Sequence, residues 1–385
     1  MTNELVDQLV SALGPERQHT AIVVRAVYQP VGGPGRTVMP PTYPIPDNER
    51  DQTKRYATAD RLVDGVKRPS VVIDQEPSQA NRVEEALLAA RDNGRLTLPL
   101  FELRTNEVRL TSLDFPHRYA DAYVRDSTVD GIRFDQSIVG QRLRMATVTD
   151  VRPLYEREPC SLIFGAWDSH RKGRWPKFAR LYSAAMYGLE PVFGDRRGGR
   201  MDPVNLRGAI DDKAKAESDW KYFPEGSRDK GQRLSEIGHG NIAPNPVHGG
   251  VTLSEVRRIA SISFSGLERL RFGDASAEAA RSARAALAAL ALAGDRLAFG
   301  GPSVWLRSGC DLAKVSETVG LERPGGDLEE FAVTAQAALD AFNELRERAA
   351  AAGVAMETDT VSLQPTAALE AAIKFAVTSG SQDGD

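Results

Sequence analysis

The chain has 385 residues, 41% hydrophobic and 26% charged, a composition typical of a globular protein with one large domain or two ordinary ones. Its only cysteines are Cys160 and Cys310, so we exclude a disulfide framework and expect a cytoplasmic protein. No apolar run approaches the roughly 18 residues that a bilayer-spanning helix needs, and the first residues lack the pattern of a signal peptide. We therefore expect no contact with a membrane.

The net charge of -4 hides an uneven distribution of charge along the chain. Residues 311–385 hold five Lys and Arg against fourteen Asp and Glu, which leaves residues 1–310 net positive. Residues 168–207 alone hold nine Lys and Arg against four acidic residues. A basic zone of this kind suits a polyanion site on one face of a protein. On charge alone, however, an ordinary solvated surface is the preferred interpretation.

The first half of the sequence predicts mixed strands and helices. Residues 4–13 have the pattern of an amphipathic helix, and residues 20–28 are β-branched and apolar, as in a buried strand. The Pro- and Gly-rich residues 29–47 predict a long loop. Ser78 is a suitable N-cap for a helix. We further expect strands at residues 70–74, 96–103, 108–113 and 161–167, and helices at residues 78–91, 116–125 and 175–187.

The second half begins with an unusual segment. Residues 194–250 are rich in Gly, Pro and charged residues and poor in aliphatic ones, which predicts an insertion that projects from the core. Strand-like sequence returns at residues 251–264. The order of elements predicts an α+β fold with helices packed on one sheet, and a ferredoxin-like or RRM-like core with insertions is one such arrangement. We expect the last helices at residues 275–293, 328–352 and 367–377, before a disordered polar tail.

Metal and catalytic motifs are weak. No two histidines have the i, i+4 spacing of a helical zinc pair, and neither cysteine has a partner nearby in the sequence. Asp168, Ser169 and His170 follow a predicted strand and could contribute to a hydrolytic site, but the nucleophile elbow of such enzymes is missing. The Gly-rich turns form neither a Walker loop nor a dinucleotide-binding motif. We therefore expect no catalytic residue, no metal and no cofactor.

Two short segments are better candidates for binding phosphate. Residues 169–175 place three cations and Trp175 at a predicted helix start, where anions are favoured. Trp175 could stack on a base or pack in the core, and a solvated basic turn is the plain alternative. Residues 196–200 (RRGGR) either bring backbone N–H groups close to phosphate or simply form a tight turn, and the sequence supports both equally.

Four segments in chain order carry distinctive motifs: residues 70–87 (SVVIDQEPSQANRVEEAL), 116–134 (PHRYADAYVRDSTVDGIRF), 161–180 (SLIFGAWDSHRKGRWPKFAR) and 235–272 (SEIGHGNIAPNPVHGGVTLSEVRRIASISFSGLERLRF). Each resembles a signature of one CRISPR-associated family. Together they resemble the major backbone subunit of the type I-U Cascade complex, also called type I-G, in the Cas-seven group of the RAMP superfamily. The resemblance covers roughly residues 20–310, and it departs from the family pattern at Gln75, Glu76 and Pro77.

The resemblance implies an RRM-like, ferredoxin-like palm with large thumb and finger insertions and added C-terminal helices. It implies that copies of the chain polymerise head to tail along CRISPR RNA, together with other Cascade subunits, and hold the guide open for pairing with target DNA. Backbone subunits of this kind are not the nuclease, so we expect no enzymatic activity. A protein that holds any guide must contact phosphate, ribose and shape rather than base edges.

On this basis we expect a RAMP-type core at residues 1–310 and an acidic helical region with a disordered tail at residues 311–385. The core would carry a loop or finger at about residues 29–69 and a basic, thumb-like insertion at residues 194–250. For Arg82, a structural role inside the core is nearly as well supported as contact with RNA. The predicted RNA-binding residues are Gln79, Asn81, Arg82, His117, Arg118, Arg125, Ser169, His170, Arg171, Lys172, Lys177, Arg196, Arg197 and Arg200.

Two alternative functions stay open at this point. The first is a metal-dependent RNase of the same superfamily that uses Asp74 or Asp168. The second is a protein-only assembly subunit, in which the basic zone binds a protein partner.

Overall fold

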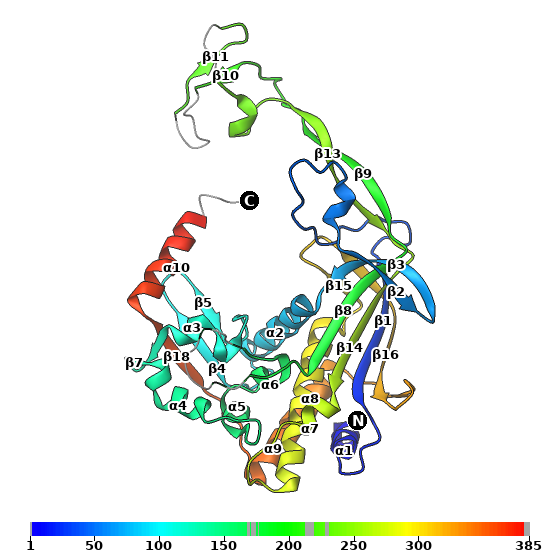
Figure 1. The fold of residues 1–385 in the computed structure, drawn as a ribbon, viewed down its shortest axis with the longest axis vertical. Helices are drawn as coiled ribbons and strands as arrows, with labels where there is room; N and C mark the ends of the chain where they lie inside the picture. Colours follow the sequence, from blue (N-terminus) through cyan, green and yellow to red (C-terminus); the bar gives the residue numbers. More distant parts are fainter. Residues whose placement is uncertain are drawn as a thin grey trace.

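The centre of the fold is an antiparallel sheet in the order β16–β1–β14–β8 (Figure 1). Its strands are β1 (Ala21–Pro30), β8 (Tyr182–Leu189), β14 (Glu255–Ser263) and β16 (Asp311–Glu322). Helix α2 (Glu76–Asp92) precedes β8, and helix α8 (Ala277–Phe299) connects β14 to β16. This is the βαββαβ order of a ferredoxin-like fold, so the predicted α+β, RRM-like core is confirmed. The computed structural model describes residues 2–167, 170, 175, 177–211, 219–227 and 231–380.

Additional strands and helices enlarge this core. β3 (Val66–Asp74) and β2 (Thr58–Val63) extend the sheet beyond β8, whereas β15 (Ser303–Trp305) and β17 (Leu328–Glu330) pair with β16. Helix α8 packs against α2, α1 and α9, and alanines along its length let these helices approach closely. None of the helices within the described residues is long and apolar enough to cross a bilayer. The bounds of the remaining helices here are α1 (Thr2–Ala12), α7 (Phe264–Glu268) and α9 (Ala335–Ala351).

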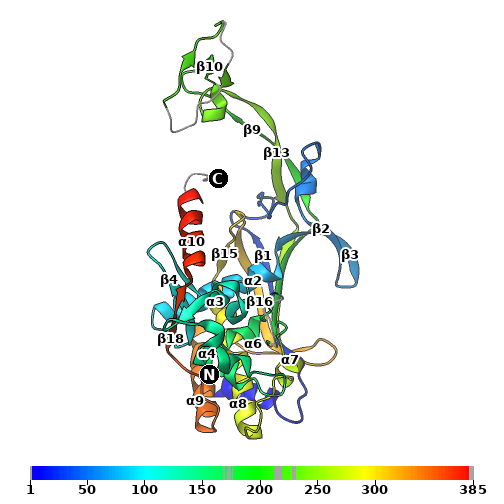
Figure 2. The same cartoon turned by 60° about the vertical axis from the view of Figure 1, so that its left-hand side comes forward.

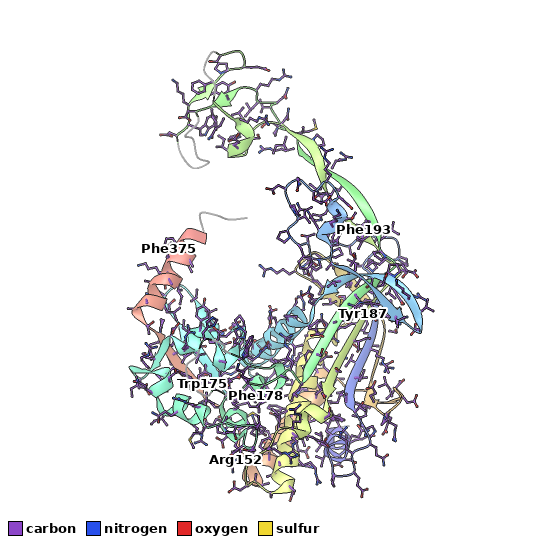
Figure 3. All side chains as sticks on the ribbon, in the orientation of Figure 1. Arg152, Trp175, Phe178, Tyr187, Phe193 and Phe375 are labelled. Carbon is purple, nitrogen blue, oxygen red and sulfur yellow. The ribbon has the colours of Figure 1, made fainter. Side chains whose placement is uncertain are left out.

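A second sheet, in the order β5–β4–β18–β6–β7, lies beside α2 on the other side of the molecule (Figure 1). From it the last helix, α10 (Ala367–Gly380), stands away from the body and leaves the Phe375 side chain 72% exposed (Figure 3). The strands are β4 (Leu100–Arg104), β5 (Arg109–Thr111), β6 (Ser127–Val129), β7 (Ile132–Arg133) and β18 (Thr360–Pro365). The short helices around them are η2 (Arg118–Ala120), α3 (Ala122–Arg125), η3 (Phe134–Gln136), α4 (Ile138–Arg144), α5 (Arg152–Arg157) and α6 (Cys160–Phe164).

A long hairpin projects from the top of the central sheet (Figures 1 and 2). It consists of β9 (Val192–Arg200) and β13 (Ile242–Thr252), which pair antiparallel with two irregularities in register. A Cβ on Gly199 would lie only 2.9 Å from the Ile242 carbonyl oxygen, so glycine permits the close approach of the two strands. The far end carries β10 (Ala209–Ile210), β11 (Tyr222–Phe223), β12 (Gln232–Arg233) and η4 (Leu234–Ile237).

A buried polar network joins the sheet to its helices. The fully buried Arg258 on β14 forms an ion pair with Asp295 on α8 and donates hydrogen bonds to Tyr182 Oη and Gln79 Oε1, both at 2.8 Å. Although burial alone would raise the pKa of Asp295, Arg258 and Arg296 hold that pKa well below its usual range. The network therefore fixes β8, β14, α2 and α8 relative to one another.

Several predictions of secondary structure were wrong. The predicted strand at residues 161–167 is helix α6 (Cys160–Phe164), which follows Pro159 and is capped by Glu158 through the Ser161 N–H. The predicted helix at residues 175–187 is replaced by β8, because strands β14 and β3 are available on both sides of this alanine-rich segment. Helix α2 begins earlier than predicted, with Gln75 rather than Ser78 at the N-cap.

The C-terminal region also differs from the helical prediction. Asp311–Glu322 form β16, which pairs along the whole of β1 and completes the central sheet. Leu328–Glu330 form β17, so helix α9 begins only at Ala335. The acidic composition of this region favoured a separate helical unit, but its β-branched residues are strand formers. The end of the predicted disordered tail, residues 381–385, lies outside the described residues.

Replacing Arg258 should test the importance of the buried network. In Arg258→Met, Asp295 and Tyr182 lose their charged partner inside the core, which should cost about 3–5 kcal/mol of unfolding free energy. Urea denaturation followed by circular dichroism measures this loss. The exposed Arg144→Met is the matched control and should change stability by less than about 0.5 kcal/mol. Equal urea midpoints for the two variants would contradict the assigned role of Arg258.

Candidate nucleic-acid interface

The base of the long hairpin is held by the loop that follows β1. Val38 and Val251 exchange two backbone hydrogen bonds of 2.9 Å, which fix this loop against β13. Thr42 pairs with Tyr56, just after η1 (Gln52–Arg55), so residues 31–51 are fastened at several points although they form no regular element. The Pro- and Gly-rich loop predicted from sequence is therefore positioned beside the hairpin.

Tyr56 is the main contact between this loop and the hairpin. Its Oη accepts a 2.9 Å hydrogen bond from the Gly250 backbone N–H and lies 3.2 Å from His248 Nδ1. Its ring stacks on Phe193 of β9, with 5.7 Å between the ring centroids. The aromatic pair and the hydrogen bonds fix the direction in which the hairpin leaves the sheet.

Two neighbouring cavities at this position share His248 as a wall residue. One, of about 450 Å³, opens between loop residues 40–42, the end of β3 and the start of α2, and Arg82 and Arg307 line it. The other, of about 340 Å³, lies between η1 and the two hairpin strands, and Arg50 and Arg197 line it. Segments far apart in the sequence thus form one continuous surface at the hairpin base.

Cationic side chains dominate this surface, which we call the hairpin-base site. Arg50, Arg196, Arg197 and Arg307 are exposed, and Arg55 and Arg82 are partly buried. Guanidinium groups suit phosphate, because each offers several N–H donors in a planar fork. The hairpin-base site consists of Arg50, Arg55, Arg82, Arg196, Arg197, His248 and Arg307.

The ionisation of His248 reflects this positive surrounding. Burial lowers the pKa of His248 below 6.5, and the nearby Arg55 and Arg196 lower it further. The imidazole is therefore mainly neutral at pH 7 in the free protein. A bound anion would reverse the effect of the two arginines and raise this pKa.

The two carboxylates that line the cavities have other partners. Asp51 caps η1, where it accepts hydrogen bonds from the Thr53 N–H and hydroxyl. Asp74 Oδ2 accepts hydrogen bonds from Gln79 Nε2 at 2.6 Å and from Arg82 Nε at 2.9 Å. In the part of the chain that the structure describes, no group of three or more His, Cys, Asp and Glu side chains could hold a metal ion.

The structure brings some predicted RNA-binding residues to this site and places others elsewhere. Arg82, Arg196 and Arg197 belong to the site, and Asn81 is exposed on α2 close to Arg82 in the sequence. Residues 196–200 form part of β9 rather than the predicted tight turn. Arg200 lies farther along the hairpin, with Nη2 3.8 Å from Asp202 Oδ2.

Gln79 and Arg118 are structural, so their predicted contact with RNA was wrong. Gln79 is fully buried, donates to Asp74 and accepts from Arg258. Arg118 is 4% exposed, donates through Nε and Nη2 to the two carboxylate oxygens of Glu84 and through Nη1 to the Gly165 carbonyl. The polar groups of both side chains are hydrogen-bonded inside the core, where no ligand can reach them.

The other predicted residues lie on the side of the second sheet or in the segment before β8. His117 is exposed, and Arg125 pairs with Asp126 at 2.7 Å. Lys177 Nζ lies 5.2 Å from the centre of the Trp167 ring, and His170 is exposed. Trp175 packs on the core beside Tyr119. Of the two alternatives for Trp175, stacking on a base or packing in the core, the structure favours packing. Ser169, Arg171 and Lys172 lie outside the described residues, as does Asp168.

Sequence reasoning missed Arg50, Arg55, His248 and Arg307. They come from three separate segments, and only residues 50–55 hold several basic residues close together. The useful signal was the long loop itself, since ordered loops of this length are often functional. Only the Val38–Val251 pairing reveals which distant strand the loop meets.

Comparison with known proteins relates part of the chain to a CRISPR-associated family. Residues 22–191 match the family model of CRISPR-associated protein GSU0053, and the match ends just before the long hairpin. This match supports the resemblance to a CRISPR-associated family that the sequence motifs predicted.

Two further comparisons add less. A solved chain titled "CRISPR RNA-guided surveillance complex, pre-nicking" is 13% identical, with a TM-score of 0.36, and the alignment covers 93% of this chain and 100% of that one. A TM-score of this size does not establish a shared fold. No curated protein matches the sequence.

The pKa of His248 leads to a testable pH dependence. Because a bound phosphate raises a pKa that the free protein holds below 6.5, binding of single-stranded RNA should take up a proton and strengthen as the pH falls. Fluorescence anisotropy at pH 5.5 and 7.5 measures the gain in affinity. In His248→Gln this gain should be smaller by a factor of about two to five. An identical pH dependence in the wild type and in His248→Gln would exclude His248 from the binding surface.

Proposed function

We propose that this chain binds CRISPR RNA through its phosphate backbone at the hairpin-base site and repeats along the RNA as the backbone subunit of a type I interference complex. The match of residues 22–191 to the GSU0053 family model supports a role in a Cascade-type complex. The observation that carries the finer proposal is the hairpin-base site, where six arginines from four parts of the chain surround two cavities.

The chemistry of this site suits a ligand of any base sequence. Its cations are arginines on an open surface, and its two acidic groups are already hydrogen-bonded within the protein. Such a surface contacts phosphate groups with little discrimination between bases, as a guide-holding protein requires. Tyr43, 37% exposed on the same loop, adds a ring on which a base could stack.

The long hairpin is suited to the role of a thumb. It leaves the sheet directly above the hairpin-base site and extends well beyond it (Figure 2). In a head-to-tail assembly, each copy uses one surface to contact a different surface on the next, and the arrangement does not close. The projecting hairpin could then separate one RNA segment from the next and leave the bases between hairpins free to pair with target DNA.

The two alternative functions make different demands on the molecule. A metal-dependent RNase would need an available carboxylate, whereas Asp74 is 5% exposed and bonded to Gln79 and Arg82. Guide-paired RNA that stays intact during incubation with Mg²⁺ would remove this alternative. A protein-only assembly subunit would purify without nucleic acid, and the ratio of absorbance at 260 nm to that at 280 nm tests this directly.

Replacing two exposed arginines of the hairpin-base site should weaken RNA binding. In Arg196→Ala/Arg307→Ala, we expect a loss of affinity that is equal for unrelated RNA sequences. We also expect the log–log salt slope to become shallower by about 0.7 for each lost phosphate contact. Fluorescence anisotropy with two unrelated 30-mers at several salt concentrations measures both effects.

The double variant Arg133→Ala/Arg144→Ala is the matched control, because both of these arginines are exposed and lie on the second sheet or beside it. It should retain the wild-type slope. Equal losses in the control and in the hairpin-base variant would show general electrostatic attraction and would contradict a defined site. A strongly sequence-dependent loss would contradict contact with the phosphate backbone.

A further inference from the structure

A third cavity is lined by segments next to α1 and α7. These elements lie at the foot of the molecule, far from the hairpin base (Figure 1). The cavity has a volume of about 500 Å³. Its walls come from residues 13–15 between α1 and β1, from residues 268–275 and from the first turns of α8. We call it the α8 pocket. It shares no residue with the hairpin-base site.

Three arginines line the α8 pocket: Arg271, Arg281 and Arg284. Glu268 is the one acidic residue on its wall, and it is already paired with Arg17 through two hydrogen bonds of 2.9 and 3.1 Å. Within the described residues, none of the three arginines forms an ion pair with a carboxylate. Three positive charges therefore meet in one cavity whose single acidic wall residue, Glu268, is already hydrogen-bonded to Arg17.

Arg284 is held in place at the wall of the pocket. Its Nε and Nη2 donate to the Leu270 carbonyl at 3.0 and 2.9 Å, and its guanidinium lies 5.8 Å from the centre of the Phe272 ring. Burial lowers the pKa of Arg284, and repulsion from Arg271 and Arg281 lowers it further. The side chain is thus fixed by neutral groups while neighbouring cations repel it, an arrangement that a bound anion would stabilise.

We propose that the α8 pocket binds a phosphate group. All three cations are arginines, whose planar forks match the oxygens of phosphate better than the point charge of lysine does. The start of α8 adds to this preference, because Ala277 lies on the pocket wall and the N-terminus of a long helix carries partial positive charge. The phosphate could belong to a nucleic-acid strand or to a free phosphorylated molecule, and the chemistry of the pocket is the same for both.

The test uses the full-length chain and a double charge reversal, Arg271→Glu/Arg281→Glu. These two side chains form no ion pair within the described residues, so the reversal should leave the fold intact, as circular dichroism can verify. Inorganic phosphate, compared with chloride at equal ionic strength, should raise the Tm of the wild type by about 2 °C or more and leave that of the variant unchanged. Arg133→Glu/Arg144→Glu changes the net charge equally and should keep the wild-type shift.

A second measurement distinguishes the two sources of phosphate. If the ligand is a nucleic-acid strand, the salt slope for binding single-stranded RNA or DNA should become shallower by about 0.7 per lost contact in Arg271→Glu/Arg281→Glu. If the ligand is a free phosphorylated molecule, the salt slope for nucleic-acid binding should be the same in this variant as in the wild type, although the variant still loses the thermal shift with phosphate. Either outcome supports the pocket.

The proposal is overturned if phosphate stabilises the wild type and Arg271→Glu/Arg281→Glu equally, or stabilises neither. If the charge reversal prevents folding, the milder Arg281→Gln takes its place, and its thermal shift should fall by at least half. The proposal does not depend on the role of the hairpin-base site. The variant Arg196→Ala/Arg307→Ala should therefore keep the full thermal shift with phosphate, whether or not it still binds RNA normally.

Discussion

The ion pair between Arg258 and Asp295 is the interaction on which the rest of the structure depends. Arg258 lies on a central strand and is fully buried, so its positive charge needs a partner of opposite charge within the core. Asp295 on α8 forms the ion pair with it, and Arg258 also donates hydrogen bonds to Gln79 and Tyr182. The same Gln79 donates to Asp74 at the end of β3. The network thus extends from the middle of the sheet to the wall of the hairpin-base site.

This continuity explains how a stable core positions a surface made of loops. Asp74 is fixed by Gln79 on one side and holds Arg82 on the other, so one guanidinium of the surface is oriented by the core. On the opposite wall, Tyr56 joins the loop after β1 to the hairpin through Gly250 and Phe193. For the remaining arginines, contact with a flexible polyanion requires positive charge rather than one fixed side-chain geometry.

The sequence predicted the core better than it predicted the surface. Alternation in β1 and periodicity in α2 and α8 depend on local pattern, and these elements were found close to their predicted positions. β8 was mistaken for a helix and β16 for part of a helical region, because strand pairing between distant segments decides both. Charge alone could not separate Arg118, whose partner Glu84 is 34 residues away, from an arginine that faces solvent. The hairpin-base site depends in the same way on distant pairings such as Val38 with Val251.

Ultraviolet cross-linking of bound RNA, followed by mass spectrometry of the attached peptides, tests the central claim most directly. The account predicts cross-links in the peptides that contain residues 40–56 and 192–200, where Tyr43, Tyr56 and Phe193 lie around the hairpin base. Other RRM-like proteins hold RNA on the open face of the sheet, which here includes Tyr187 and Ile259. Cross-links confined to that face, with none at the hairpin base, would contradict the account.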